Sequence, residues 1–244
     1  MIELHDAQVT VPAPPGAARG TPSTTIVQPT TLRLHEQRIS IIGANGSGKS
    51  TLARLLNGLI VPSSGSVRVQ DHRAPASPWL DTRRDGAVVR RLVGFMFTDP
   101  AAQLIMPTVS EDIELSLRRT HRDPAERRAA ALAVLQRFGL EGRATQSVHS
   151  LSGGQQQLLA LAAVLATDPA TVIADEPTTL LDLRNSRRIA DELFALPQQL
   201  IVITHDLELA ARAARTLVVD GGAVVFDGDP AAAIAHYRAL VEQP

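Results

Sequence analysis

Apolar and polar residues along the chain follow two different spacings. Among three short apolar runs, RISIIG (38–43) predicts a buried strand, and ATVIAD (170–175) and QLIVIT (199–204) are typical of parallel strands covered on both faces. Between the last two runs, RNSRRIADELFAL (184–196) has the spacing of an amphipathic helix. Strands that alternate with helices predict an α/β fold with a mainly parallel sheet.

The pattern adds a β part at the start of the chain and a helix-rich middle. Rough alternation of apolar and polar residues predicts strands at 2–11 and 24–34. Residues 110–139 are mostly helical in pattern, and Asp123-Pro124 marks the start of a helix within them. The helical stretch interrupts the α/β core and predicts an inserted subdomain.

Three further segments complete the predicted order of elements. TLVVDGGAVVFDG (216–228) predicts a hairpin with a Gly-Gly turn. RRLVGFMF (90–97) is interpreted as a strand that ends just before Thr98, and residues 72–87 are expected to be irregular.

Composition limits the classes of protein that the chain can belong to. The hydrophobic fraction of 44% allows a substantial core, which must be built from aliphatic residues because aromatics make up only 3%. A net charge of −1 argues against nucleic acid as the main partner. The chain has no cysteine, and no apolar run approaches the ~20 residues of a membrane span.

A phosphate-binding loop is the clearest motif. GANGSGKS (43–50) matches GxxxxGK[ST] between a predicted strand and a predicted helix. Lys49 is the only lysine in the chain, which suits a cramped phosphate site that a planar guanidinium would not fit. We expect Lys49 to bridge the β- and γ-phosphates and the Ser50 hydroxyl to bind Mg²⁺. The expected phosphate-contacting residues are Gly43, Ala44, Asn45, Gly46, Ser47, Gly48, Lys49, Ser50 and Thr51.

Two acidic residues end the strand TVIADEP (171–177), where neighbouring side chains point to opposite sides. We expect Asp175 to hold Mg²⁺ and Glu176 to polarise the attacking water. His205 follows the next apolar strand, in LIVITHD, and would hold Glu176 and the water in line.

Five motifs in this order resemble the nucleotide-binding domain of an ABC ATPase: GANGSGKST, LSGGQ, VIADEP, LLD and ITHD. The resemblance covers nearly the whole chain. It implies ATP hydrolysis with Mg²⁺ in a P-loop core that has a mainly parallel sheet, an N-terminal antiparallel β part and an inserted helical subdomain. Residues 1–244 would form one such domain, with its core at 1–97 and 166–244 and the helical subdomain at 98–165.

The resemblance also implies a second ATPase subunit. In this family two domains pair head to tail, and the LSGGQ segment of one grips the γ-phosphate held by the other. The residues that would do so are Ser152, Gly153, Gly154 and Gln155. Asp182 resembles the residue that communicates across that interface. Whether two identical copies or two related chains pair is left open.

Two positions depart from the family pattern. The family usually has a glutamine at the position of Thr98, where it touches Mg²⁺; the threonine hydroxyl could reach the metal through water, and Gln103 is a second candidate. An aromatic residue normally stacks on adenine near the N-terminus, where this chain has Val11. Val11 offers no π-face, so selectivity for ATP over GTP is open.

The segment from Thr98 to Arg119 resembles the ATPases of energy-coupling factor importers, which take up vitamins and transition metals. Its residue pattern is most similar to that of the biotin-uptake ATPase, and next to those of the cobalt or nickel systems. Leu104 to Met106 could form part of a groove for a helix of a transmembrane scaffold. The resemblance implies a peripheral place on the cytoplasmic face of the membrane and a substrate-binding membrane component. The alternative is a soluble ABC ATPase of the Fe–S assembly class.

Overall fold

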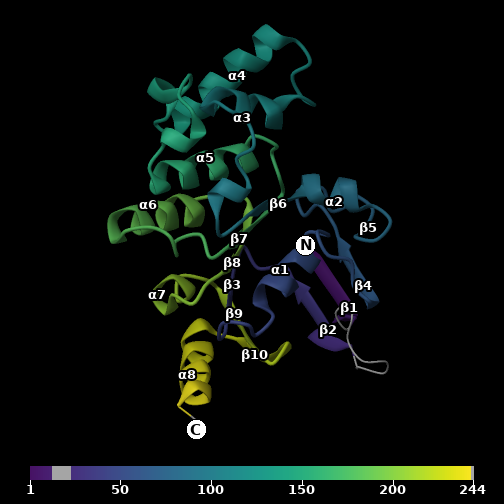
Figure 1. Ribbon diagram of the computed structural model, residues 1–244. Coiled ribbons are helices and arrows are strands. Elements are labelled where there is room, and N and C mark those ends of the chain that lie inside the picture. Colours follow the sequence, from purple (N-terminus) through teal and green to yellow (C-terminus); the bar gives the residue numbers. More distant parts are fainter. Residues whose placement is uncertain (13–22, 243–244) are drawn as a thin grey trace.

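The computed structural model describes residues 1–12 and 23–242 (Figure 1). Two β-sheets carry the fold, and helices cover both faces of the larger one. The helix-rich middle of the chain lies at one end of the molecule and the C-terminal helix at the other (Figure 1).

The larger sheet has six strands in the order β10-β9-β3-β8-β7-β6. Neighbouring strands from β9 to β6 are parallel, and only β10 pairs antiparallel, with β9. The strands are β3 (Arg38–Ile42), β6 (Val93–Met96), β7 (Thr171–Asp175), β8 (Gln199–Ile203), β9 (Arg215–Asp220) and β10 (Ala223–Gly228). The predicted mainly parallel sheet and the Gly-Gly hairpin are therefore confirmed.

The smaller sheet is antiparallel, with the order β2-β1-β4-β5, as the alternation at the start of the chain predicts. Its strands are β1 (Ile2–Val11), β2 (Thr24–Leu34), β4 (Ser64–Val69) and β5 (Leu80–Asp81).

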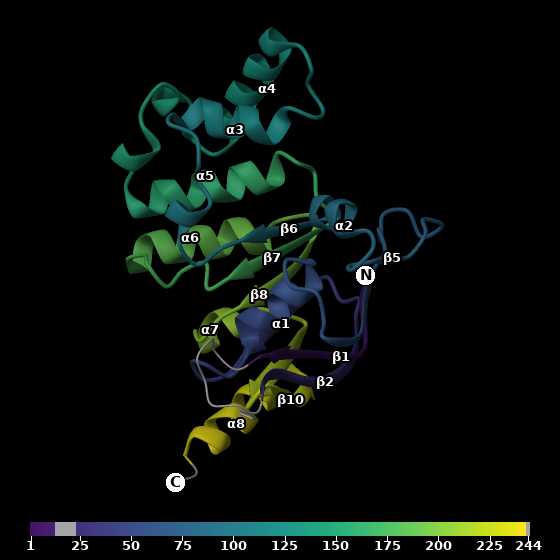
Figure 2. The ribbon, with the colours of Figure 1, turned by 45° about the vertical axis from the view of Figure 1, so that its right-hand side comes forward.

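The helices form layers on the two faces of the six-stranded sheet. Helix α1 packs with the smaller sheet against one face, α5 and α6 cover the other, and α3 and α4 pack on α5 farther from the sheet (Figure 2). The helices are α1 (Lys49–Leu56), α2 (Gly86–Leu92), α3 (Val109–Leu117), α4 (Pro124–Arg137), α5 (Gly153–Leu165), α6 (Leu183–Phe194), α7 (Leu207–Ala210) and α8 (Pro230–Val241). Helix α4 starts at Pro124 with Asp123 as its N-cap, as predicted.

Strand β7 shows why an uninterrupted apolar run is needed in the large sheet. Successive side chains of a strand point to opposite faces. Val172 and Ala174 pack with the helical layer, whereas Ile173 packs with the layer that contains α1. All three are fully buried, so a polar residue at any of them would face a dry core.

The interpretation of residues 72–97 was partly wrong. Residues Gly86–Leu92 form helix α2, and the strand begins only at Val93. Val89 is buried and Leu92 packs partly buried against the core, at the helical spacing of three, while Arg90 and Arg91 stay exposed. A two-residue strand, β5, also lies in the stretch expected to be irregular.

The division of the chain into a core at 1–97 and 166–244 and a subdomain at 98–165 stays a prediction. None of the helices within residues 1–12 and 23–242 combines the length and the apolar character needed to cross a membrane.

Candidate functional site

The phosphate loop lies between β3 and α1 and lines a cavity of about 320 Å³. Ile26 on β2 and Glu176 after β7 complete the lining. The loop residues that face the cavity are Asn45, Gly46, Ser47, Gly48, Lys49, Ser50 and Thr51. The N-terminal end of α1 opens onto this space, where its backbone N–H groups favour an anion.

Lys49 is buried, and its ammonium group bonds to the loop itself. Nζ donates to the carbonyl oxygens of Gly43 at 2.7 Å and Ala44 at 2.8 Å. Burial lowers the pKa of Lys49, while the nearby carboxylates of Glu176 and Asp175 act in the opposite direction. The loop therefore holds a desolvated cation beside the cavity. A phosphate group bound there would supply the negative charge that pairs with it.

The β9–β10 hairpin braces the phosphate loop from a distant part of the chain. The Gly222 N–H donates to the Ser47 carbonyl at 2.9 Å, and the Gly222 carbonyl accepts from the Gln28 N–H at 2.8 Å. A Cβ atom at Gly222 would lie 2.5 Å from the Ile26 carbonyl oxygen. The turn thus joins the loop to β2 through contacts that only glycine permits.

Replacing Gly222 by alanine is expected to raise the Kd for ATP about tenfold, since relief of the clash with β2 would displace the loop. Gly221→Ala is the matched control: both glycines have positive φ, +52° and +80°, but a Cβ at Gly221 meets open space. Titration of the two variants with a fluorescent ATP analogue separates the clash from backbone strain. Equal losses in both variants would contradict the bracing role.

Two oxygen ligands suited to a magnesium ion meet where the start of α1 faces the end of β7. The Ser50 hydroxyl donates to Asp175 Oδ1 at 2.9 Å. Burial raises the pKa of Asp175, and the hydrogen bond from Ser50 opposes this rise. No group of three or more His, Asp or Glu residues that could enclose a metal occurs in the described ranges. Two hard oxygens without a full cage fit Mg²⁺, which keeps water and phosphate ligands.

Glu176 follows β7 directly and has a left-handed backbone, with φ +51°. Its Oε2 lies 2.8 Å from Nδ1 of His205 and accepts a bond of 2.9 Å from the Thr179 hydroxyl. The pairing of Glu176 with His205 is the arrangement predicted from the two strand ends. Thr179 was missed, because only the turn after Glu176 brings its hydroxyl to the carboxylate.

Two other candidates near the cavity have different surroundings from those expected. Val11 is 47% exposed and is not among the residues that line the cavity, where Ile26 stands instead. The side-chain amide of Gln103 accepts from the Phe97 N–H at 3.2 Å and donates to the Ala160 carbonyl at 3.2 Å. Both ends of that amide have backbone partners, and the roles of Gln103 and Thr98 toward Mg²⁺ stay predictions.

The LSGGQ segment forms the start of α5, on the other side of the sheet from the cavity. Ser152 and Gly153 are exposed, and the Ser152 N–H donates to Gln155 Oε1 at 3.0 Å. None of Ser152 to Gln155 is among the described residues that line the cavity. The segment is therefore an open helix start without a phosphate site of its own in the same chain.

Asp182 caps the next helix and is linked to the LSGGQ segment through Asn185. Its carboxylate accepts from the Asn185 backbone N–H at 2.9 Å and side-chain amide at 2.8 Å, which lowers the pKa of Asp182. A Cβ at Gly154 would lie 2.6 Å from Asn185 Cγ, so the two motifs are in close contact. Asn185 was not predicted, because its role depends on how α5 packs on α6.

Comparison with known proteins decides the family. Residues 28–179 match the model of the family described as ABC transporter. The chain belongs to the ABC transporter family. It is an ABC ATPase, as the resemblance of its five motifs predicts, and ATP is its nucleotide substrate.

Relatives and solved structures extend the match over most of this ABC ATPase. It is 44% identical to the biotin transport ATP-binding protein BioM of Rhizobium etli, over 88% of this chain and 92% of the relative. It is 34% identical to the energy-coupling factor transporter ATP-binding protein EcfA1 of Lactiplantibacillus plantarum, over 84% and 72%.

Two solved structures share the fold of this ABC ATPase. One is an ATP-binding cassette solved as a dimer in a post-hydrolysis state with ADP and phosphate; its TM-score is 0.78 at 28% identity, over 94% of this chain and 99% of that one. The other is cbiO1 of Clostridium perfringens, described as part of the ABC transporter complex cbiONQ, with a TM-score of 0.76 at 27% identity over 99% and 93%.

Proposed function

We propose that this ABC ATPase hydrolyses ATP at sites shared by two subunits arranged head to tail, and that the cycle drives an energy-coupling factor importer. One observation supports the head-to-tail dimer. Helix α1 and helix α5 pack on opposite faces of the same sheet, so one chain cannot place its LSGGQ segment on its own nucleotide. A second subunit, turned to face the first, can supply it.

Each shared site would be built from both subunits. Lys49 and the loop N–H groups of one subunit would hold the phosphates, and Ser152 to Gln155 of the other would cap the γ-phosphate with a helix start. Glu176, steadied by His205, would accept a proton from the attacking water. Ser50 and Asp175 would hold Mg²⁺, which when bound offsets the negative charge of the phosphates. ATP would favour the closed dimer, because only in that state do the phosphate loop of one subunit and the LSGGQ segment of the other both bind its phosphates.

The transporter class is supported by the relatives. Two of them, from Rhizobium etli and Rhodobacter capsulatus, are named biotin transport ATP-binding protein BioM, at 44% and 36% identity. The cbiO1 structure is described as part of a transporter complex. We therefore propose biotin as the transported substrate and a transmembrane scaffold as the partner, which would place this chain on the cytoplasmic face of the membrane.

An exposed apolar side chain beside a hollow lined mostly by charged residues, on the helical end, suits a scaffold helix with both apolar and charged side chains. Leu104 belongs to the core, whereas Ile105 is 70% exposed. Met106 borders a hollow of about 140 Å³ whose other lining residues are mostly charged: Glu111, Glu114, Leu115, Arg118 and Arg127. The buried carboxylate of Asp112 accepts from the N–H groups of Ile105 and Met106 at 2.9 and 3.1 Å. These bonds hold the Ile105 side chain outward. We call Ile105 and Met106 with this hollow the Ile105 patch.

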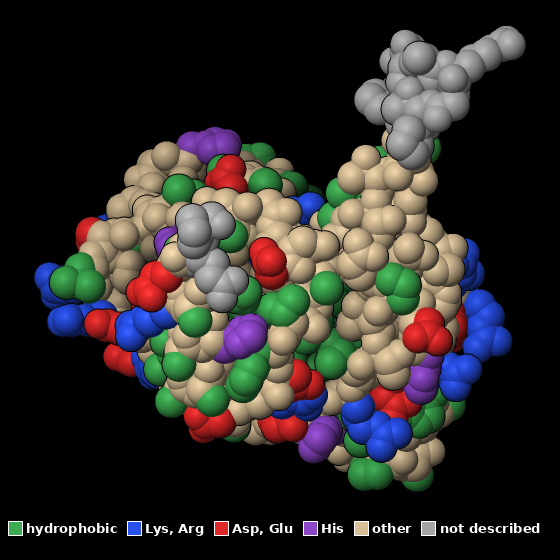
Figure 3. All heavy atoms as spheres, turned by 90° about the horizontal axis from the view of Figure 1, so that it is seen from below, with side chains coloured by type: hydrophobic (Ala, Val, Ile, Leu, Met, Phe, Trp, Pro, Cys, Tyr) green, Lys and Arg blue, Asp and Glu red, His purple; other side chains and the backbone are tan. Residues whose placement is uncertain are grey.

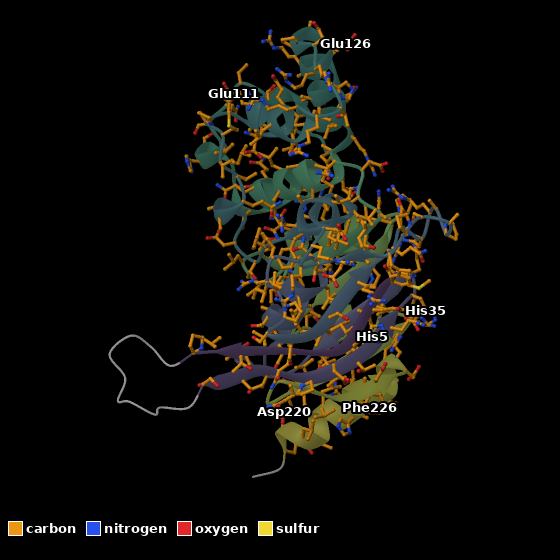
Figure 4. All side chains as sticks on the ribbon, turned by 90° about the vertical axis from the view of Figure 1, so that its right-hand side faces the viewer. His5, His35, Glu111, Glu126, Asp220 and Phe226 are labelled. Carbon is orange, nitrogen blue, oxygen red and sulfur yellow. The ribbon has the colours of Figure 1, made fainter. Side chains whose placement is uncertain are left out.

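The Ile105 patch lies away from the β9–β10 hairpin that braces the phosphate loop. Glu111, which also borders the hollow, is at the helical end of the molecule, and Asp220 at the start of the hairpin turn is at the other (Figure 4). A helix of the scaffold that seats on the patch would not cover the phosphate loop. Docking and nucleotide binding can therefore be tested separately.

Replacing Ile105 by aspartate is expected to abolish co-purification with the scaffold from detergent-solubilised membranes, because the charge would have to be buried against an apolar helix. The basal ATPase rate should stay within about twofold. Val241→Asp is the matched control, since Val241 is 62% exposed but lies on α8. In cells that make the whole transporter, Ile105→Asp should also stop uptake of labelled biotin.

Two results would contradict the proposal. Purification of the unaltered chain with soluble partners only would favour the alternative, a soluble ATPase of the Fe–S assembly class. In cells that carry Ile105→Asp, intact biotin uptake combined with lost cobalt or nickel uptake would assign the transporter to a metal.

Nucleic acid is not proposed as a partner, since acidic, basic and apolar side chains are interspersed over the face seen from below (Figure 3).

A further inference from the structure

The carboxylate of Glu176 is held on one side only. Oε2 accepts the Thr179 hydroxyl bond and lies within hydrogen-bond distance of His205, whereas Oε1 has no protein partner in the part of the chain that the structure describes. An ionised carboxylate only accepts hydrogen bonds, so the threonine hydroxyl must be the donor. The contacts therefore engage Oε2 and leave Oε1 without a partner among the described residues, and Glu176 lines the cavity.

Thr179 is tied to Glu176 by two hydrogen bonds within one turn. Its own N–H donates to the Glu176 carbonyl at 3.3 Å, so backbone and side chain both close the same turn. A β-branched side chain has a restricted χ1, which limits where the hydroxyl can point. Thr179 and the His205 side chain are both exposed, the latter to 57%.

We propose that Thr179 is a positioning residue for ATP hydrolysis. Its hydroxyl holds Oε2 of Glu176, so that Oε1 is presented to the attacking water. This inference rests on the proposed role of Glu176. It assigns a catalytic contribution to a residue outside the acidic pair, one that acts on the rate and not on nucleotide binding.

The test is the pair Thr179→Val and Thr179→Ser. Valine keeps the shape and removes the donor, so we expect kcat to fall about tenfold with the KM for ATP unchanged; serine keeps the donor and should restore most of the rate. Thr120→Val is the control for loss of a hydroxyl elsewhere, because the Thr120 hydroxyl bonds only to the Leu117 carbonyl and His121 at the end of α3. Thermal unfolding of each variant checks that the fold is intact.

The possible results separate this inference from the proposed function. An unchanged kcat in Thr179→Val, a parallel rise in KM, or a serine variant as slow as the valine variant would overturn the positioning role. If Glu176→Gln abolishes turnover while Thr179→Val does not slow it, the inference fails and the role of Glu176 stands. If Glu176→Gln turns over normally, both fail.

Discussion

Glu176→Gln is expected to lower the steady-state ATPase rate by about 10²- to 10⁴-fold and to leave ATP binding intact. The amide has nearly the shape of the carboxylate, but it cannot accept a proton from water. His205 Nδ1 and the Thr179 hydroxyl can still bond to the amide oxygen, so the turn should keep its geometry. Phosphate release under steady-state conditions measures the rate, and equilibrium dialysis measures ATP binding.

The same variant reports on the dimer. With hydrolysis blocked, ATP should hold two subunits together long enough to be separated from monomers by size-exclusion chromatography. Glu126→Gln on the exposed start of α4 is the control, since it changes the same group at the helical end of the molecule (Figure 4). Normal turnover by Glu176→Gln would remove Glu176 from its role. Full activity of the unaltered chain at dilutions where it is monomeric would contradict the shared site.

Lys49→Ala is expected to weaken ATP binding by about a hundredfold or more. The ammonium group is already buried and desolvated beside the loop carbonyls, so its contact with phosphate is made where water cannot substitute for it. Lys49→Arg should also bind poorly, since the wider guanidinium does not fit the space between Gly43 and Ala44.

The control for Lys49→Ala is Arg33→Ala, which removes a surface cation that pairs with Glu3. Fluorescence titration with an ATP analogue compares the variants, and thermal unfolding without nucleotide checks the fold. Unchanged ATP affinity in Lys49→Ala would show that the 320 Å³ cavity is not the nucleotide site.

Local signals made the core of the site predictable from the sequence. The phosphate loop, the acidic pair and the Gly-Gly turn each depend on residues within a few positions of one another, so their identity and spacing suffice. The start of α4 is predictable for the same reason, because Asp123 caps the helix that Pro124 begins. Family resemblance then places these local pieces in one fold.

Contacts between distant segments were not predictable. Ile26 reaches the cavity because β2 lies beside the hairpin turn, whereas Val11, nearer to the expected position, points to solvent. Asn185 joins two motifs only through the packing of α5 on α6. The end of α2, residues 90–92, was taken for strand because the apolar run that continues into β6 begins there, and its start fell in the stretch expected to be irregular.

The solitary lysine has a practical consequence. Because Lys49 is the only lysine in the chain, protein grown with lysine labelled with ¹⁵N at Nζ gives one amine resonance in an NMR spectrum. That resonance comes from an amine bonded to the carbonyls of Gly43 and Ala44, so arrival of a phosphate should move it. Nucleotide occupancy could then be followed through the whole cycle without altering any residue.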